Sequence, residues 1–213
     1  MRFVMSYSCG KDSTLALHKM LEKGHTPVCL VVMLKKEDQR SYFHGADREM
    51  LKKYEKALGI PLLLCPSKGA DYVQAFEEGL AKAKAMGAEA AAFGDMDIEE
   101  NRSWEEERCR NIGLKALFPL WQQGREGNVE ELLRLGYACI IKSINHTLLP
   151  EKLLGQQMDW NAVEMMRRAG IDVCGEKGEY HTLVIDGPIF RESLDFKTGG
   201  IFRIGDYSVV DVR

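Results

Sequence analysis

Five apolar segments alternate with four amphipathic segments over the first 120 residues, and this alternation constrains the fold more than any other feature. The run PVCLVVML at 27–34 is apolar almost throughout, which is typical of a parallel strand buried on both faces. Strands joined by helical crossovers lie parallel, so the pattern predicts an α/β fold with a doubly wound five-stranded sheet, and we infer the strand order 3-2-1-4-5. The predicted strands are 2–7, 27–34, 60–65, 88–93 and 114–120, and the predicted helices are 13–23, 44–58, 71–86 and 99–112.

The pattern changes after residue 120. The polar, glycine-containing stretch QQGREG at 122–127 indicates a connector, and a smaller α+β unit follows it. The expected helices of this unit are 129–135 and 159–169, and its expected strands are 137–143, 182–185 and 201–212. We therefore expect two domains, a nucleotide-binding domain at 1–120 and a substrate-binding domain at 121–213.

The sequence SCGKDS at 8–13 lies between the first predicted strand and the first predicted helix. Small residues at such a junction direct several backbone N–H groups at one spot, and the helix N-terminus adds partial positive charge, so the loop favours a phosphate. Gly10 lets the backbone approach the phosphates, Ser8 and Ser13 offer hydroxyl groups, and Lys11 supplies a full charge. A capped helix start with a surface lysine is the alternative, but the strand-loop-helix context favours phosphate binding.

Asp12 distinguishes this loop from other phosphate-binding loops. A carboxylate beside phosphates usually requires a magnesium ion between them, which makes Asp12 a candidate metal ligand. A Walker A loop would need glycine at position 5 and serine or threonine at position 12, but these positions hold Met5 and Asp12.

Gly94 and Asp95 follow the fourth predicted strand. Ligands of doubly wound sheets bind beyond the carboxyl ends of the strands, where the strand order reverses. The inferred order places strands one and four side by side, so we expect Gly94 and Asp95 to face the loop at 8–13 and to contact the ribose or α-phosphate of a nucleotide. A strand-end turn with a helix-capping aspartate is the alternative.

A second polar segment, CGEKGEYHT at 174–182, leads into a predicted strand. Its two glycines allow tight turns, so that neighbouring side chains can project into one space. Glu176, Glu179 and His181 could recognise an amine or imidazole group and relay a proton, and Thr182 could anchor a carboxylate or phosphate. A polar turn before an edge strand is the alternative.

The helix predicted at 99–112 is strongly charged. Arg102 and Glu106 stand at i and i+4, where they form either an ordinary surface pair or part of a substrate site. We expect Glu105 and Glu107 on a solvated face. Trp104 is unusual in such a helix, which suggests that it packs against the second domain or a ligand.

The composition argues against several classes of partner. The net charge of −3 provides no basic surface for nucleic-acid binding by counterion release. No apolar run approaches the length of a membrane span, and the N-terminus begins directly with a strand, so we expect a cytoplasmic protein. The six cysteines include no CxxC pair, which favours reduced, buried thiols and argues against sulfur-transfer chemistry. The sequence leaves a homodimer open.

Three blocks of sequence resemble known motifs. SCGKDS resembles the SGGKDS loop of the PP-loop ATP pyrophosphatases, with Cys9 where that family usually has glycine or serine. GDMDIEENRSWEEERCRNIGLKALFPLW at 94–121 and GEKGEYHTLVIDGP at 175–188 resemble the motif pair of the diphthine–ammonia ligase family. Trp104, Lys177 and His181 stand where members of that family carry a basic residue, a glycine and a glutamate. With these departures the chain resembles a bacterial-type relative.

This resemblance implies an adenine nucleotide alpha hydrolase-like fold and an ATP-dependent amide ligase. The enzyme would use ATP and Mg²⁺ to adenylate an acceptor carboxylate, diphthine-like and carried by a protein or a small molecule, with release of pyrophosphate. Ammonia would then displace AMP. The alternatives are another PP-loop ATP pyrophosphatase that acts on a tRNA or a small molecule, and a non-catalytic ATP-binding module.

The resemblance also implies a role for each matching residue. The implied catalytic residues are Lys11, Asp12, Glu176, Glu179 and His181, and Asp12 is the implied metal ligand. The implied ATP-binding residues are Ser8, Cys9, Gly10, Lys11, Asp12, Ser13, Met33, Gly94 and Asp95. The implied substrate-binding residues are Arg102, Glu106, Glu176, Gly178, Glu179, Tyr180, His181 and Thr182.

Overall fold

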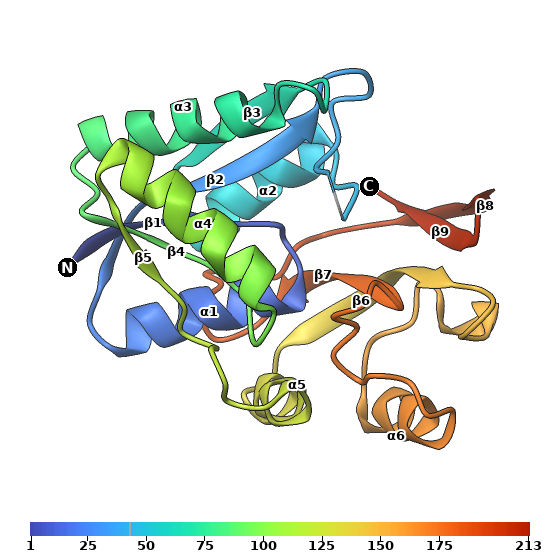
Figure 1. Cartoon of the computed structure of the whole chain (residues 1–213). Coiled ribbons are helices and arrows are strands. Elements are labelled where there is room, and N and C mark those ends of the chain that lie inside the picture. Colours follow the sequence, from blue (N-terminus) through green and yellow to red (C-terminus); the bar gives the residue numbers. More distant parts are fainter. Residues whose placement is uncertain (43) are drawn as a thin grey trace.

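A computed structural model describes residues 1–42 and 44–213, which form two β-sheets and the helices that cover them (Figure 1). The first sheet is parallel, and its order β3-β2-β1-β4-β5 confirms the inferred order. Its strands are β1 (Arg2–Ser6), β2 (Thr26–Lys35), β3 (Leu62–Ser67), β4 (Ala90–Ala92) and β5 (Lys115–Leu117). Strands β1 and β4 pair directly, so the segments that follow them emerge side by side.

Helices cover both faces of this sheet, as the near-continuous apolar run in β2 predicts. Leu30, Val32 and Leu34 of β2 join the core beneath α1 (Lys11–Glu22) and α2 (Arg48–Leu58). The alternate residues Val31 and Met33 join a second core beneath α3 (Tyr72–Ala85) and α4 (Glu99–Ile112). Because successive side chains of a strand point to opposite faces, one strand can serve both cores only if it is apolar at almost every position.

The second sheet is antiparallel, with the order β7-β6-β9-β8. Its strands are β6 (Ala138–Asn145), β7 (Tyr180–Asp186), β8 (Thr198–Ile204) and β9 (Tyr207–Val212). The helices α5 (Arg125–Arg134) and α6 (Trp160–Arg168) and the short 3₁₀ helix η1 (Glu151–Leu153) belong to this half of the chain.

Several predicted boundaries are wrong. The helix predicted from residue 44 begins at Arg48, because the Asp47 carboxylate accepts a hydrogen bond from the backbone N–H of Met50 at 2.8 Å and caps the helix there. The strand predicted at 114–120 is limited to β5, since the chain turns from Pro119 onward. The strand predicted at 201–212 is the hairpin β8–β9, whose turn contains Gly205 at φ 55°.

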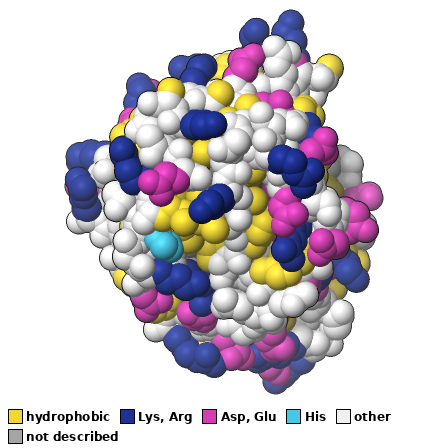
Figure 2. Space-filling view, turned by 60° about the vertical axis from the view of Figure 1, so that its left-hand side comes forward, with side chains coloured by type: hydrophobic (Ala, Val, Ile, Leu, Met, Phe, Trp, Pro, Cys, Tyr) yellow, Lys and Arg dark blue, Asp and Glu magenta, His cyan; other side chains and the backbone are white. Residues whose placement is uncertain are grey.

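The charged side chains at the surface and the buried cysteines agree with what the composition predicts. Figure 2 shows Lys and Arg side chains interspersed with Asp and Glu side chains on one face of the molecule, with no continuous basic patch on the face shown. The six cysteines are free and buried, as predicted. Within the two described ranges, no helix combines the length and apolarity needed to cross a membrane.

Strand β7 joins the two sheets. The backbone N–H of Val184 donates to the carbonyl of Cys9 at 3.0 Å, and the hydroxyl of Tyr54 on α2 donates to the carbonyl of Val184 at 2.6 Å. Lys19 on α1 also pairs with Glu131 on α5 at 2.7 Å. One apolar core extends through both halves of the chain as a result.

The hydroxyl of Tyr54 is a testable part of this junction, because the Tyr54 side chain is fully buried. Replacing Tyr54 with Phe leaves the Val184 carbonyl buried without that donor, so we expect a loss of about 1–3 kcal/mol in the free energy of unfolding. Urea denaturation measures the loss. Tyr207→Phe, at a half-buried position on β9, is the matched control. Equal stability of Tyr54→Phe and the wild type would contradict the proposed importance of this bond.

Candidate active site

A cavity of about 640 Å³ lies beyond the carboxyl ends of β1 and β4. Three segments that are far apart in the sequence meet there, namely the loop at 8–13, the end of β4 and the segment at 175–182. The lining consists of Ser6, Ser8, Lys11, Asp12, Ser13, His44, Tyr72, Phe76, Gly94, Asp95, Asn101, Trp104, Glu105, Gly175, Glu176, Gly178, Tyr180, His181 and Thr182. The structure thus brings together most of the predicted site residues.

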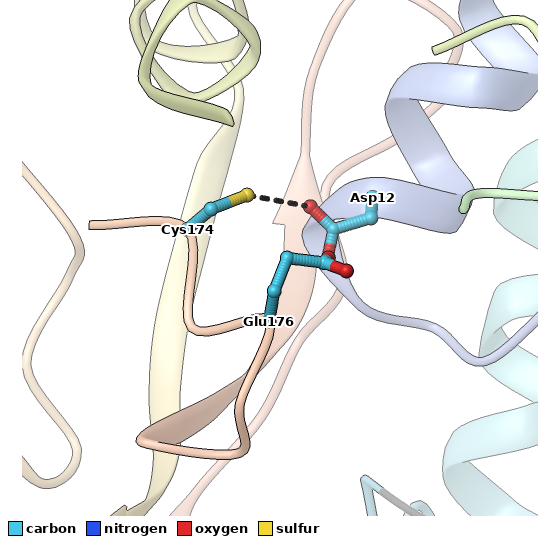
Figure 3. A group of neighbouring side chains, drawn as sticks. All are labelled: Asp12, Cys174 and Glu176. Atoms are coloured by element: carbon cyan, nitrogen blue, oxygen red, sulfur yellow. Dashed lines mark hydrogen bonds between the residues drawn. The ribbon is translucent and has the colours of Figure 1, made fainter. Parts of the chain in front are cut away.

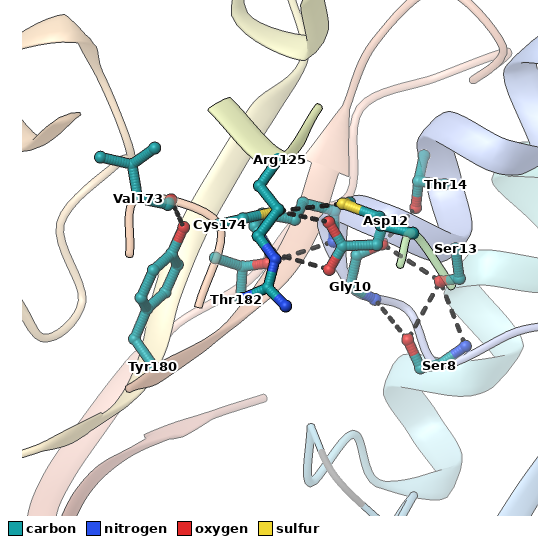
Figure 4. A network of polar contacts seen from close by, with 12 residues as sticks. Ser8, Gly10, Asp12, Ser13, Thr14, Arg125, Val173, Cys174, Tyr180 and Thr182 are labelled. Atoms are coloured by element: carbon teal, nitrogen blue, oxygen red, sulfur yellow. Dashed lines mark hydrogen bonds and ion pairs between the residues drawn. The ribbon is translucent and has the colours of Figure 1, made fainter. Parts of the chain in front are cut away.

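The loop at 8–13 is held in shape by its own hydrogen bonds (Figure 4). The hydroxyls of Ser8 and Ser13 lie 3.0 Å apart, and the N–H of Gly10 donates to the Ser8 hydroxyl at 3.3 Å. Gly10 is the N-cap of α1, so no side chain there competes for the N–H groups of the first helical turn. Cys9 adopts a left-handed conformation (φ 70°), and its buried side chain joins the apolar core instead of the cavity lining.

Gly94 faces the loop, as the strand order predicts. A Cβ atom built at Gly94 would lie 2.9 Å from the backbone nitrogen of Ser13 and 3.0 Å from the carbonyl carbon of Asp12. The first distance is shorter than real contacts of a Cβ atom and the second is at their lower limit, so the close approach of β4 to the loop favours glycine. The N-cap of α4 is Ile98, which excludes the helix-capping alternative for Asp95.

Lys11 and Asp12 form a largely buried ion pair, with Nζ and Oδ2 2.7 Å apart. The Lys11 ammonium also lies 5.2 Å from the ring centre of Tyr180. Burial by itself would lower the pKa of Lys11, but the Asp12 carboxylate and its neighbours hold this pKa well above its ordinary value. Lys11 therefore keeps its positive charge in the cavity at neutral pH.

Asp12, Cys174 and Glu176 converge from α1 and from the segment before β7 (Figure 3). Their carboxylate and thiol atoms lie within 4.8 Å of one another, and the Cys174 thiol faces Asp12 Oδ1 at 3.7 Å. Burial raises the pKa of Glu176 to about 7, and the Asp12 carboxylate adds to this rise. Two carboxylates that repel each other in this way fit a bound divalent cation, and their oxygen atoms suit Mg²⁺ while the thiol does not.

Glu105 corrects one prediction from the sequence. The Glu105 side chain lines the cavity instead of a solvated face, and it lies beside Asp95. Burial raises the pKa of Asp95, and burial together with the Asp95 charge raises the pKa of Glu105 well above its ordinary value. Asn101, one helical turn earlier, donates from Nδ2 to Asp95 Oδ1 at 3.0 Å.

The segment at 175–182 supplies one wall of the cavity from the edge strand β7. The backbone N–H of Lys11 donates to the Thr182 hydroxyl at 3.1 Å, which ties this wall to the loop. The Glu179 carboxylate is buried outside the lining, where it accepts the N–H of Lys177 at 3.0 Å. The His181 ring packs on the His44 ring, and burial lowers the pKa of His181 to about 3. His181 is therefore neutral at physiological pH.

Several other predicted site residues lie outside the cavity lining. Arg102 and Glu106 pair with each other at 2.9 Å, and the Arg102 guanidinium lies over the ring of Trp121 at 4.7 Å. Met33 lines a smaller cavity of about 70 Å³, which shares Ser6, Ser8 and Tyr72 with the large one. Sequence reasoning missed His44, Tyr72, Phe76 and Asn101. For Asn101 the sequence offered one indication, namely its i, i+4 spacing to Glu105 with Trp104 between them.

Comparison with protein-family models covers both halves of the chain. The model described as the diphthamide synthase N-terminal domain matches residues 1–116, and the model described as the diphthamide synthase C-terminal domain matches residues 125–213. The chain belongs to the diphthamide synthase family. The cavity described above therefore lies between segments of the two matched regions.

Relatives in this family carry the name diphthine–ammonia ligase. The protein of Homo sapiens is 28% identical over 219 residues, which cover 91% of this chain and 82% of the relative. The protein of Danio rerio is 25% identical over 218 residues, which cover 91% of this chain and 86% of the relative. The protein of Saccharomyces cerevisiae is 26% identical over 231 residues, which cover 90% of this chain but 34% of the relative.

One solved structure shows a weaker likeness. It is described as a predicted subunit of tRNA methyltransferase from Methanocaldococcus jannaschii, and it matches with a TM-score of 0.47 and 15% sequence identity. The match covers 91% of this chain and 100% of the other. Family membership rests on the two family models.

The close approach at Gly94 gives a stability prediction. Gly94→Ala forces a Cβ atom against the backbone of the loop at 8–13, so we expect a loss of about 1–3 kcal/mol in the free energy of unfolding. Gly127→Ala on α5 is the matched control, because a Cβ atom there has open space around it. Urea denaturation compares the two variants. An unchanged Gly94→Ala would show that β4 and the loop are not in contact.

Glu176 gives a pH prediction. Its pKa of about 7 exceeds the ordinary 4.5, so the folded protein binds this proton more tightly than the unfolded chain. Stability contributed by this group is full below about pH 4.5 and is lost as the pH rises to about 7. Without divalent cations, Glu176→Gln should therefore exceed the wild type in stability by about 1–2 kcal/mol at pH 8, a figure reduced for the partial exposure of the side chain.

Urea denaturation at pH 5 and pH 8 measures this difference. Glu107→Gln, at an exposed position on α4, should show no comparable change with pH. A Glu176→Gln variant that is less stable than the wild type at pH 8 would contradict the raised pKa.

Proposed function

We propose that this chain is an ATP-dependent amide ligase that adenylates an acceptor carboxylate and then amidates it with ammonia. The observation that carries the proposal is the meeting of Lys11, Asp12 and Glu176 in one cavity, between the loop at 8–13 and the segment at 175–182. Membership in the diphthamide synthase family and the name of the relatives support the reaction class.

The loop at 8–13 and the end of β4 are the proposed ATP site. The triphosphate would lie over the N-terminus of α1, where backbone N–H groups and the helix dipole favour an anion. Gly94 would leave room for the ribose and the α-phosphate. The small cavity beside Met33, which shares the lining residues Ser6 and Ser8 with the large one, would take the adenine.

Lys11 is the proposed source of charge stabilisation at the reacting phosphate. A carboxylate is a poor acyl donor because its leaving group would be an oxide, and adenylation replaces this oxide by AMP. The acceptor oxygen would attack the α-phosphorus, the bond to pyrophosphate would break, and ammonia would then attack the acyl carbon and release AMP. A fixed cation such as Lys11 in a partly dry cavity stabilises the charge that develops in the first step.

Asp12 and Glu176 are the proposed ligands of Mg²⁺. The ion would neutralise charge on the phosphate oxygens and on the leaving pyrophosphate. In its absence the mutual repulsion of the two carboxylates raises the pKa of Glu176, after the larger effect of burial.

The wall at 175–182 is the proposed acceptor site. Its polar side chains that reach the cavity include Glu176 and the neutral ring of His181. A neutral imidazole can accept one hydrogen bond and donate another, so it can orient an acceptor without adding charge. His181 stands where the motif of the diphthine–ammonia ligase family has a glutamate. We therefore infer that the acceptor carboxylate differs from diphthine in the part that would contact His181.

The proposal is tested by the products formed from ATP. Protein incubated with ATP, magnesium chloride, ammonium chloride and a panel of carboxylates should release AMP and pyrophosphate when a suitable acceptor is present. Lys11→Ala should reduce ATP–pyrophosphate exchange by about 10²-fold or more, because it removes a preorganised positive charge from the reacting phosphate. Its circular dichroism spectrum should stay unchanged.

Lys23→Ala, just beyond the end of α1, is the matched control and should exchange pyrophosphate at the wild-type rate. Formation of ADP in place of AMP would refute the proposal. A strict requirement for tRNA would favour a tRNA-modifying PP-loop enzyme instead.

A further inference from the structure

A pair of carboxyl groups occupies the cavity wall formed by β4 and α4. Asp95 follows β4, and Glu105 reaches the same place from the second turn of α4. Glu105 Oε2 is buried and has no hydrogen-bond donor among residues 1–42 and 44–213. Two carboxyl groups can hydrogen-bond to each other only while a proton lies between them. The Glu105 side chain lines the cavity, and an unpaired acceptor oxygen is costly in this state, so a bound donor that reaches it would satisfy it.

No cationic side chain in the described part of the chain neutralises this pair. Arg102 pairs with Glu106, and Lys11 pairs with Asp12. Arg108 contacts Glu77 at 3.2 Å and also pairs with Glu107. Besides Glu105, Asp95 has the amide of Asn101 as a hydrogen-bond partner, and this amide carries no charge. Apart from a proton shared between the two groups, nothing in the described part of the chain compensates the negative charge of this pair.

Aromatic rings stand beside the two carboxyl groups. Phe76 and Trp104 are stacked with their ring centres 5.5 Å apart, and the ring centre of Tyr72 lies 6.2 Å from that of Trp104. All three side chains line the cavity. The faces of aromatic rings attract cations, as the Arg108 guanidinium 5.6 Å from the ring centre of Trp104 illustrates, so the rings and the carboxyl groups favour the same kind of ligand.

We propose that Asp95 and Glu105, with the aromatic wall of Tyr72, Phe76 and Trp104, bind an ammonium group. The inference rests on the proposed function, and it assigns a place to a nitrogen compound in that reaction. An ammonium group can donate N–H bonds to the carboxyl oxygens while its remaining charge faces the rings. The group would come from one of two sources, namely the free ammonium ion that supplies the amide nitrogen or an ammonium group carried by the acceptor.

A divalent metal ion fits this wall less well. Mg²⁺ requires a near-octahedral set of oxygen ligands, and Phe76 and Trp104, which line the same cavity, offer none. The oxygen atoms of Asp12 and Glu176 provide the better place for such an ion. The two pairs of carboxyl groups in the cavity would thus bind different cations.

Thermal unfolding in ammonium chloride tests the site directly. A ligand that binds the folded protein raises the melting temperature, and the rise follows its concentration and affinity. We expect ammonium chloride to raise the melting temperature of the nucleotide-free protein above that in potassium chloride at equal ionic strength. Potassium is the control because it carries the same charge but cannot donate hydrogen bonds.

Two isosteric variants test whether the ammonium-specific rise in melting temperature depends on Asp95 and Glu105. Glu105→Gln and Asp95→Asn should each lose most of the ammonium-specific rise, and Glu107→Gln, an exposed residue of the same helix, should keep it. Each variant is compared with itself in potassium chloride, so a change in its basic stability does not affect the result. The inference is overturned by equal effects of ammonium and potassium on the wild type, or by an undiminished rise in both variants.

Substituted ammonium salts distinguish the two sources. A larger rise with ammonium than with methylammonium chloride points to the free ion, and a larger rise with methylammonium points to a group on the acceptor. A largest rise with tetramethylammonium, which has no N–H donor, or with magnesium chloride in a manner dependent on Glu105 would overturn the inference. The measurement uses neither ATP nor an acceptor. Ammonium binding can therefore be observed even if the proposed ligase activity is absent, so a failure of one proposal can be told apart from a failure of the other.

Discussion

The attachment of strand β7 to the loop at 8–13 is the contact on which the rest of the site depends. Two hydrogen bonds join β7 to the loop, from Val184 to Cys9 and from Lys11 to Thr182, and a third, from Tyr54 on α2 to Val184, holds β7 beside it. Each of them fixes the edge of the antiparallel sheet against the carboxyl end of the parallel sheet. The segment before β7 is thereby carried over Lys11 and Asp12, although more than 160 residues separate the two in the sequence.

The same contact explains why the unusual backbone of Cys9 is tolerated. A left-handed conformation costs energy for any residue other than glycine. At Cys9 it directs the carbonyl toward β7 and places the side chain in the apolar core, where it is fully buried. The local cost is offset by a bond between the sheets and by burial of the thiol. A serine or glycine there could adopt the same backbone but would bury less apolar surface.

The parts of the fold set by local pattern could be predicted from the sequence. The apolar run in β2 and the helix-strand alternation gave the sheet order, and that order placed Gly94 beside Ser13. The orientation of α4 could not be predicted in this way, because Glu105 and Glu107 look alike in a charged helix. The packing of Trp104 against Phe76 and the bond from Asn101 to Asp95 show which side of α4 faces the cavity. His44 could not be predicted either, since it arrives from a connecting segment with no repeating pattern.

The charge balance of the cavity limits which ligands it can bind. Among its described lining residues, four carboxyl groups face a single Lys or Arg side chain, that of Lys11. A cavity with this balance would repel a triphosphate unless cations accompanied it, because Lys11 is already paired with Asp12. The two carboxyl pairs differ in what surrounds them. Asp12 and Glu176 lie next to the phosphate-type loop, while Asp95 and Glu105 lie against aromatic rings. The first setting suits an ion that is shared with phosphate oxygens, and the second suits a nitrogen cation. Under the proposed function, a single acidic cavity would therefore keep the activation of a carboxylate apart from the supply of its nitrogen.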